Sequence, residues 1–432
     1  MSTGTSPSWS EAITNTDTDT TPQTPRPRGR PPKNHTWDST QGKYVPVNVV
    51  TSPSVNRAWI LAALNSDLVT QHQTPVTYQQ AISGPDSAHW IKAIQSELQS
   101  LKSCSVWKLV VLTAVPKNSK PIPTKWVFKI KGDGAGNVAR YKARLVVCGY
   151  RQKFGRDYDL TFAPVAHAAS IRMVLAMAVA HGMYLRQFDV KTAFLYGELP
   201  EHQSVYLAPP TGVAVPSGYV LKLDKAMYGL KQAPLMWNRH LNNTLCKFGF
   251  TRCQLDPCVY FKNDTATSLV LAVVVDDIIL AGSTRQATDV FASQLQSVYT
   301  ITDLGAPTRL VGLNISVQPD KITLDQNQFV KDLAARFKQS NCKSVTSPAA
   351  PGDVPEGASP LLLPNNQYLS LVGSLLWASI SRPDIAVAVS IACSKAVSQL
   401  KQTCMQPYAS CATFFTLITF VLPFENTLNP LL

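Results

Sequence analysis

Two adjacent aspartates, Asp276 and Asp277, lie within an almost purely apolar stretch that runs from Leu269 to Ala281. Such a run of Val, Ile and Leu is typical of a buried β-strand. Neighbouring carboxylates repel each other and lose hydration there, and a buried carboxylate is unfavourable unless it is paired or bound to a metal. The pattern favours a tight hairpin that presents both acids to a divalent cation, and hard oxygen ligands suit Mg²⁺. The alternative is a solvent-exposed turn that the acids cap.

A third acid strengthens the metal-site interpretation. The segment Tyr184–Val190 is also strand-like, and Asp189 lies near its end. An aspartate on one strand and an Asp-Asp hairpin later in the chain is the layout of a two-metal nucleotidyl-transfer site. In such a site two cations about 3.5–4 Å apart activate the attacking hydroxyl and stabilise the leaving oxygen.

Short motifs follow one another in a specific order along the chain. They are Lys125–Lys129, Arg140–Val146, Tyr158–Val165, Phe188–Leu195, Met227–Pro234, Val275–Asp277, Asp303–Gly305, Leu310–Leu313 and Arg382–Ile385. With this ordered set the sequence resembles the reverse transcriptase of Ty1/copia-type LTR retrotransposon polyproteins, over residues 75–400 or so. No single motif decides the resemblance, but the order is highly specific.

The resemblance implies an α+β fold of the right-hand polymerase type, with palm and fingers, and RNA-directed DNA polymerase activity. It implies that Asp189, Asp276 and Asp277 are the catalytic acids. Two Mg²⁺ ions, or Mn²⁺ in their place, would be held by Asp189, Asp276 and the main-chain carbonyl of Val190. One departure is Val274, because family members usually carry tyrosine at this position. The missing hydroxyl should leave metal binding intact and weaken the positioning of the primer terminus.

The resemblance also implies a nucleotide pocket. Lys142 and Arg144 lie on the expected fingers hairpin, and a planar guanidinium and a point charge both suit a triphosphate. Phe194 follows the Asp189 strand, where a rigid ring would stack under the sugar and exclude a 2′-hydroxyl. The alternatives are a solvated strand face for the basic pair and a core position for the phenylalanine.

Two softer assignments complete the expected site. Tyr228, Gly229 and Lys231 resemble the nucleotide-binding segment under the incoming base pair, where the glycine permits close approach of the template. The primer grip, which positions the 3′-end, is expected at Leu310, Val311, Gly312 and Leu313.

Composition is consistent with a polyanionic partner. The chain has 432 residues and a formal charge of +13, although many basic proteins bind no nucleic acid. The N-terminal basic segment, residues 25–33, resembles an AT-hook in which Arg28, Gly29 and Arg30 enter the minor groove of A·T-rich DNA. A basic linker or a nuclear-localisation patch are the alternatives. The nine cysteines lack paired metal spacing, which indicates reduced thiols and an intracellular protein of the cytoplasm or nucleus.

We predict five segments along the chain. They are a disordered extension (1–74), a helical lead-in (75–104), palm and fingers (105–347), a connection-like segment (348–400) and a divergent tail without RNase H (401–432). Helices are expected at 89–101, 171–180, 235–248 and 289–299, and a β-hairpin at 126–147. The apolar part of the tail, residues 408–424, is short for a membrane span.

The sequence therefore predicts a reverse transcriptase whose partners are an RNA template, a DNA primer and dNTPs, with A·T-rich DNA as a further ligand. The alternative is a decayed retrotransposon relic that only binds nucleic acid. The three acids favour the enzyme, and Val274 and the tail favour the relic.

Overall fold

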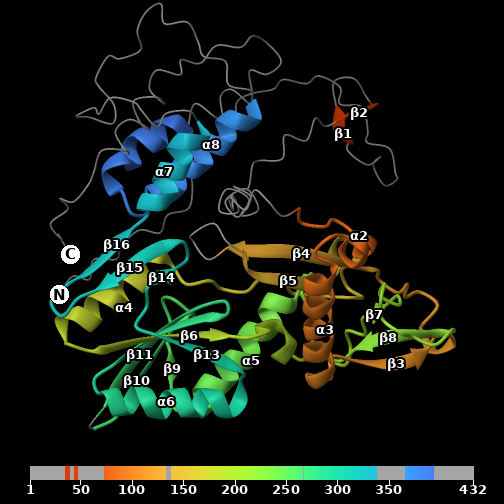
Figure 1. Cartoon of the computed structure of the whole chain (residues 1–432), viewed down its shortest axis with the longest axis horizontal. Helices are drawn as coiled ribbons and strands as arrows, with labels where there is room; N and C mark the ends of the chain where they lie inside the picture. The colour runs from red at the N-terminus through yellow and green to blue at the C-terminus, as the bar shows by residue number, and fades with distance from the viewer. Residues whose placement is uncertain are drawn as a thin grey trace, which may run out of the picture. The chain divides into compact units, whose positions relative to one another are not determined.

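The computed structural model describes residues 35–38, 43–46, 73–132, 138–265, 267–337 and 365–393 (Figure 1). The chain divides into two compact units, Met1–Arg57 and Ala58–Leu432. In the first unit, β1 (His35–Asp38) and β2 (Lys43–Pro46) pair antiparallel, with Trp37 opposite Tyr44. The register of this strand pair places two residues that favour strands opposite each other, and the predicted disorder of residues 1–74 as a whole stays a prediction. The AT-hook-like residues Arg28, Gly29 and Arg30 lie outside the described residues, as does the tail.

The second unit contains a six-stranded antiparallel sheet in the order β13-β6-β12-β11-β10-β9. Its strands are β6 (Tyr184–Val190), β9 (Thr251–Arg252), β10 (Val259–Asn263), β11 (Ser268–Val274), β12 (Asp277–Gly282) and β13 (Ile301–Gly305). Strands β6 and β12, far apart in the sequence, are direct neighbours. We call β11 and β12 with their connecting turn the acidic hairpin.

Helices cover both faces of this sheet, which explains why the acidic hairpin is apolar almost throughout. They are α4 (Ala168–Ala180), α5 (Ala233–Lys247) and α6 (Arg285–Val298). Helices α5 and α6 share an apolar cluster with Phe188 and Ile278, whereas α4 packs with Ile279 and its neighbours. Because side chains alternate along a strand, Asp277 and Asp189 are on the same face as Ile279.

A second hairpin, β4 (Thr124–Gly132) with β5 (Val138–Val147), has one apolar and one basic face. Its apolar residues Trp126, Phe128 and Leu145 are buried in a cluster that includes helix α3 (Ser87–Ser103). The opposite face carries the six cations Lys125, Lys129, Lys131, Arg140, Lys142 and Arg144. We call β4 and β5 the basic hairpin.

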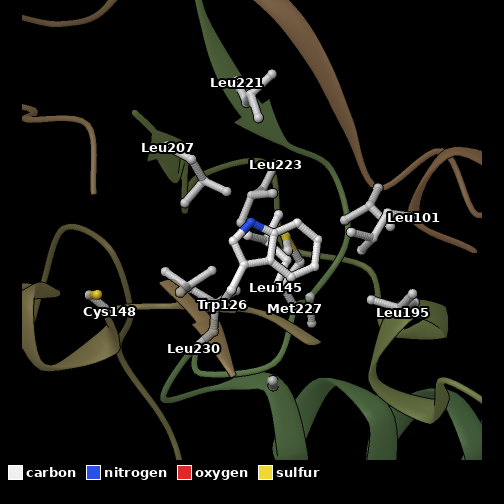
Figure 2. Close-up of a cluster of buried hydrophobic side chains, with 14 of the residues drawn as sticks. Leu101, Trp126, Leu145, Cys148, Leu195, Leu207, Leu221, Leu223, Met227 and Leu230 are labelled. Atoms are coloured by element: carbon white, nitrogen blue, oxygen red, sulfur yellow. The ribbon is translucent and has the colours of Figure 1, made fainter. Parts of the chain in front are cut away.

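A small sheet completes this core. It consists of β3 (Trp107–Val111), β8 (Tyr219–Leu223) and β7 (Tyr206–Leu207), in that order. Figure 2 shows Trp126 in the middle of the cluster, among leucines from these strands and Met227. The Trp126 indole Nε1 donates to the carbonyl of Thr211 at 2.9 Å. Helix α2 (Tyr78–Ser83) begins with a capping box between Thr77 and Gln80.

The C-terminal part of the described chain forms a separate sheet and a helical cluster. The strands are β14 (Arg309–Leu310), β15 (Leu313–Val317) and β16 (Ile322–Asp325). Helices α7 (Asn327–Arg336) and α8 (Asn365–Ala378) follow, and Leu333, Leu371, Leu375 and Ile385 share their own apolar cluster. The 3₁₀ turns are η1 (Leu112–Ala114), η2 (Gly149–Arg151), η3 (Ala193–Tyr196) and η4 (Pro383–Ile385).

The mixed α+β class and each expected helix and hairpin are confirmed. Helix α6 begins at Arg285, before the expected Asp289, because the Thr284 hydroxyl accepts a hydrogen bond from the Ala287 N–H at 3.1 Å and caps the helix. None of the described helices combines the length and the apolar character that a bilayer crossing requires.

Candidate active site

The three acids meet where β6 and the acidic hairpin lie side by side. Asp189 and Asp277 are direct partners in the antiparallel register. The main-chain N–H of Val190 donates to the carbonyl of Asp276 at 2.8 Å. The structure therefore brings Asp189 beside the Asp276–Asp277 pair, which is distant from it in the sequence, at the end of a central strand pair.

The turn of the acidic hairpin is strained. Its two central residues are Val275 and Asp276, between the paired Val274 and Asp277. Val275 has a φ of 60°, whereas Asp276 does not have a positive φ, as in a type II′ turn, whose first central position is usually glycine. A β-branched residue is unfavourable in this conformation, and such strain is concentrated at functional sites. The Trp237 indole Nε1 donates to the Val275 carbonyl at 2.6 Å and fixes the strained residue.

The acids are mutually repulsive and partly desolvated. Burial, together with the charges of Asp276 and Asp189, raises the pKa of Asp277 to about 6, and a hydrogen bond from Gln187 Nε2 at 3.1 Å opposes the rise. Burial also raises the pKa of Asp276; the Asp189 charge adds to the rise, and the positive charge of Arg144 opposes it. These shifts mean that the site favours the arrival of positive charge.

The donor set suits a hard divalent cation, because each acid offers only oxygen and a cation between them would relieve their repulsion. In the part of the chain that the structure describes, no three His, Cys, Asp or Glu side chains converge as a group able to hold a metal ion. The backbone thus gathers the acids without the carboxylates forming a three-ligand set. Metal binding by Asp189, Asp276 and the Val190 carbonyl stays a prediction.

The expected nucleotide residues form a contiguous stack beside the acids. The Arg144 guanidinium lies 4.8 Å from the centre of the Tyr228 ring, and the Phe194 ring lies 5.1 Å from the same ring at a tilt of 64°. Burial and the neighbouring Arg144 lower the pKa of Lys142 to about 8. Phe194 is half-buried and contacts the core, and its role as a gate for the sugar stays a prediction.

The segment after Tyr228 is attached to the end of β5 by close backbone contact. A Cβ at Gly229 would lie 2.1 Å from the Val147 carbonyl oxygen, and the φ of 93° also requires glycine. The close approach that the structure shows at Gly229 is thus that of the protein chain itself. The Lys231 ammonium donates to the Tyr158 hydroxyl at 3.0 Å, so this cation already has a partner within the protein.

The expected primer grip is the turn between β14 and β15. Leu310 and Leu313 are buried, and the turn residues Val311 and Gly312 have φ values of 49° and 75°. Positive φ at both central residues is typical of a type I′ hairpin turn. Gln187 connects this turn to the acids, since its Nε2 donates both to Asp277 and to the main-chain carbonyl of Arg309 at 3.2 Å.

Sequence reasoning missed three residues of the site. Trp237 fixes the turn, Gln187 links the acids to β14, and Glu97 accepts from the Leu145 N–H at 3.3 Å beneath the basic hairpin. Burial raises the pKa of Glu97. A signal existed for Glu97 alone, because an acid on the apolar face of a predicted helix requires a partner.

Comparison with known proteins decides the family. Residues 104–351 match the family described as Reverse transcriptase (RNA-dependent DNA polymerase). The chain belongs to this reverse transcriptase family. Its relatives are retrotransposon Pol polyproteins of the copia/Ty1 type.

The relatives are much longer than the matched region. The chain is 36% identical over 340 residues to the Pol polyprotein from transposon TNT 1-94 of Nicotiana tabacum, covering 75% of this chain and 25% of that protein. It is 34% identical over 313 residues to the Pol polyprotein from transposon RE1 of Arabidopsis thaliana, covering 72% and 21%. It is 26% identical over 266 residues to the truncated transposon Ty1-A Gag-Pol polyprotein of Saccharomyces cerevisiae, covering 58% and 21%. The chain therefore spans about a quarter of the length of these relatives or less.

Proposed function

We propose that this reverse transcriptase domain is an active RNA-directed DNA polymerase that adds deoxynucleotides to a DNA primer on an RNA template. The observation that supports this most strongly is the junction of β6 with the acidic hairpin. There Asp189 pairs with Asp277, and Val190 is hydrogen-bonded to Asp276.

In this proposal the fold is a right-hand polymerase. The six-stranded sheet with α5 and α6 is the palm, and the basic hairpin with α3 forms the fingers. A palm must fix acids on adjacent strands, and fingers must present cations to a triphosphate; the two hairpins meet these requirements with opposite charge.

The reaction joins the primer 3′-oxygen to the α-phosphorus of the dNTP, while the bond to the β-phosphate oxygen breaks and pyrophosphate leaves. Two bound Mg²⁺ ions would lower the pKa of the 3′-hydroxyl and neutralise the leaving group. Asp189, Asp276 and the Val190 carbonyl would hold them. Asp277, which is tied to Gln187, keeps the primer turn in register with the acids.

The remaining groups orient the substrates. Arg144 and Lys142 hold the triphosphate by charge-assisted hydrogen bonds. Phe194, supported by the Tyr228 ring, lies under the sugar and excludes a 2′-hydroxyl. The turn from Leu310 to Leu313 positions the primer end.

The test is primer extension by the purified full chain on poly(rA)/oligo(dT) with Mg²⁺. Extension with dTTP that requires Mg²⁺ would support the proposal. Absence of extension, with primer–template binding retained, would favour the second candidate, a relic that only binds nucleic acid. The observation that favours this candidate is Val274, which pairs with Asp277 in the acidic hairpin and carries no hydroxyl.

A further inference from the structure

Three aromatic side chains are exposed on the loop between β5 and α4. Tyr150, Phe154 and Phe162 are 72%, 74% and 82% exposed. Aromatic rings are enriched at surfaces that contact a partner. We call these three residues the exposed aromatic loop.

The exposure of Phe154 does not come from a loose chain. The buried Asp157 carboxylate accepts from the Lys153 N–H at 2.8 Å and from the Arg156 Nε at 2.8 Å. The Phe154 ring also packs edge-on against Tyr158, with 5.9 Å between the ring centres. A turn that is ordered by hydrogen bonds to Asp157 therefore holds the Phe154 ring in solvent. A preorganised binding surface requires such order.

The loop is joined to the nucleotide pocket. The buried Gln152 side chain accepts from the Lys231 N–H at 2.8 Å and donates to Gln232 at 2.9 Å. A Cβ at Gly149 would lie 2.0 Å from the Gly229 carbonyl oxygen, so the two backbones touch. The start of the loop is thus held by backbone contacts against the segment that follows Tyr228.

The charge of this surface suits a nucleic-acid strand. Arg151 and Lys153 are exposed on the loop itself. Arg156 donates to the carbonyl of Asn118, which brings a neighbouring segment with exposed Lys117 and Lys120 against the loop. Aromatic rings that alternate with cations are the usual surface for single-stranded nucleic acid, because every base has a face that stacks.

We propose that Tyr150, Phe154 and Phe162 stack on unpaired bases of the template before these bases reach the nucleotide pocket. This inference rests on the proposed function. The paired primer–template would contact the acids and the primer turn, whereas the single-stranded part of the template would approach the pocket across the exposed aromatic loop.

The test measures binding of the full chain to an oligo(dT) primer on RNA templates with 5′ overhangs of increasing length, without dNTP. The wild type should bind long overhangs more tightly than blunt duplex, and abasic nucleotides in the overhang should remove this gain. Phe154→Ala and Tyr150→Ala should each reduce the gain by about five-fold or more, since stacking on one ring is worth about 1–3 kcal/mol per base. Affinity for blunt duplex and the melting temperature should not change. Tyr184→Ala, which removes a half-exposed ring at the far end of β6, is the matched control and should keep the full gain.

The two proposals fail in different ways. A wild-type chain that binds no primer–template at all would refute the proposed function, and the role of the loop with it. A wild-type gain that persists in Phe154→Ala and Tyr150→Ala, or that abasic nucleotides leave intact, would overturn the stacking role alone. If Phe154→Ala and Tyr150→Ala change the oligomeric state but keep the gain in affinity, the rings form a protein contact. This result would also overturn the stacking role.

Discussion

The acidic hairpin and the basic hairpin are both antiparallel strand pairs, but they carry charges of opposite sign in different positions. The first is apolar on both faces and carries its charges only at the turn, whereas the second is apolar on one face and charged along the other. Burial raises the pKa of Asp277 to about 6 in one and lowers the pKa of Lys142 to about 8 in the other. Each hairpin therefore holds charge that is unfavourable until a ligand of opposite sign arrives. A metal-bound nucleoside triphosphate supplies both signs at once.

Removal of an acid should distinguish the role of the acidic hairpin from that of the basic hairpin most clearly. Asp189→Asn and Asp276→Asn each replace a negative oxygen ligand and should reduce extension by about a thousand-fold or more, because a catalytic cation supplies several kcal/mol. Primer–template affinity should remain, since the basic hairpin is untouched. Single-turnover extension and anisotropy measure the two effects, and equal loss of both would mean that the acids hold the fold rather than the metal.

The strained turn provides the next largest effect. Trp237→Phe keeps the ring and removes the hydrogen bond to the Val275 carbonyl, which should raise the Mg²⁺ concentration at half-maximal rate by about 10- to 100-fold, as for other groups that orient ligands.

Trp126→Phe is the control for this variant, because it loses an equivalent hydrogen bond, to Thr211, in another cluster. It should alter stability but not the Mg²⁺ requirement. An equal Mg²⁺ shift in both variants would show that the effect is general loosening.

Selection of deoxynucleotides over ribonucleotides should depend on Phe194, and substitution of Phe194 should not change the Mg²⁺ requirement. Phe194→Val removes the ring that packs on Tyr228. The efficiency of ribonucleotide incorporation relative to deoxynucleotide incorporation should then rise by about ten-fold or more, within the range for one contact group. Competition between dTTP and UTP on poly(rA) measures this ratio. An unchanged ratio would make Phe194 a core residue only.

The basic hairpin should make substrate capture depend on pH. With its pKa lowered to about 8, Lys142 is charged below this value and loses its charge as the pH rises through it. The kcat/KM for dNTP should fall by about two- to ten-fold between roughly pH 7.5 and 9. Lys142→Arg should abolish the decline, because arginine stays protonated. A decline that persists in this variant would come from another group.

The sequence was most informative where a residue type is energetically unfavourable in its surroundings, as an acid is within an apolar run. Acids in an apolar run could be placed at a hairpin turn, and β6 could be placed beside it, because few arrangements satisfy adjacent buried carboxylates. Trp237 and Gln187 could not be predicted, since each contacts groups distant in sequence and an apolar or amide residue has many ordinary uses. The strand pair β1–β2 was missed because eight paired residues in a polar stretch give too short a pattern.

At Gly229 the structure gives a physical reason for glycine that differs from the one that the resemblance implied. The resemblance implied a glycine that admits the template, whereas the contact in the structure is with the Val147 backbone. Both need a position without a side chain, and the sequence alone does not distinguish them.

The most direct measurement is anomalous diffraction from Mn²⁺ in crystals of the chain with primer–template and a non-hydrolysable dNTP. Two peaks about 3.5–4 Å apart, between Asp189 and Asp276, are expected in the wild type and should be lost in Asp189→Asn. Peaks elsewhere, or peaks that Asp189→Asn leaves in place, would contradict the assignment of this strand junction as the catalytic centre.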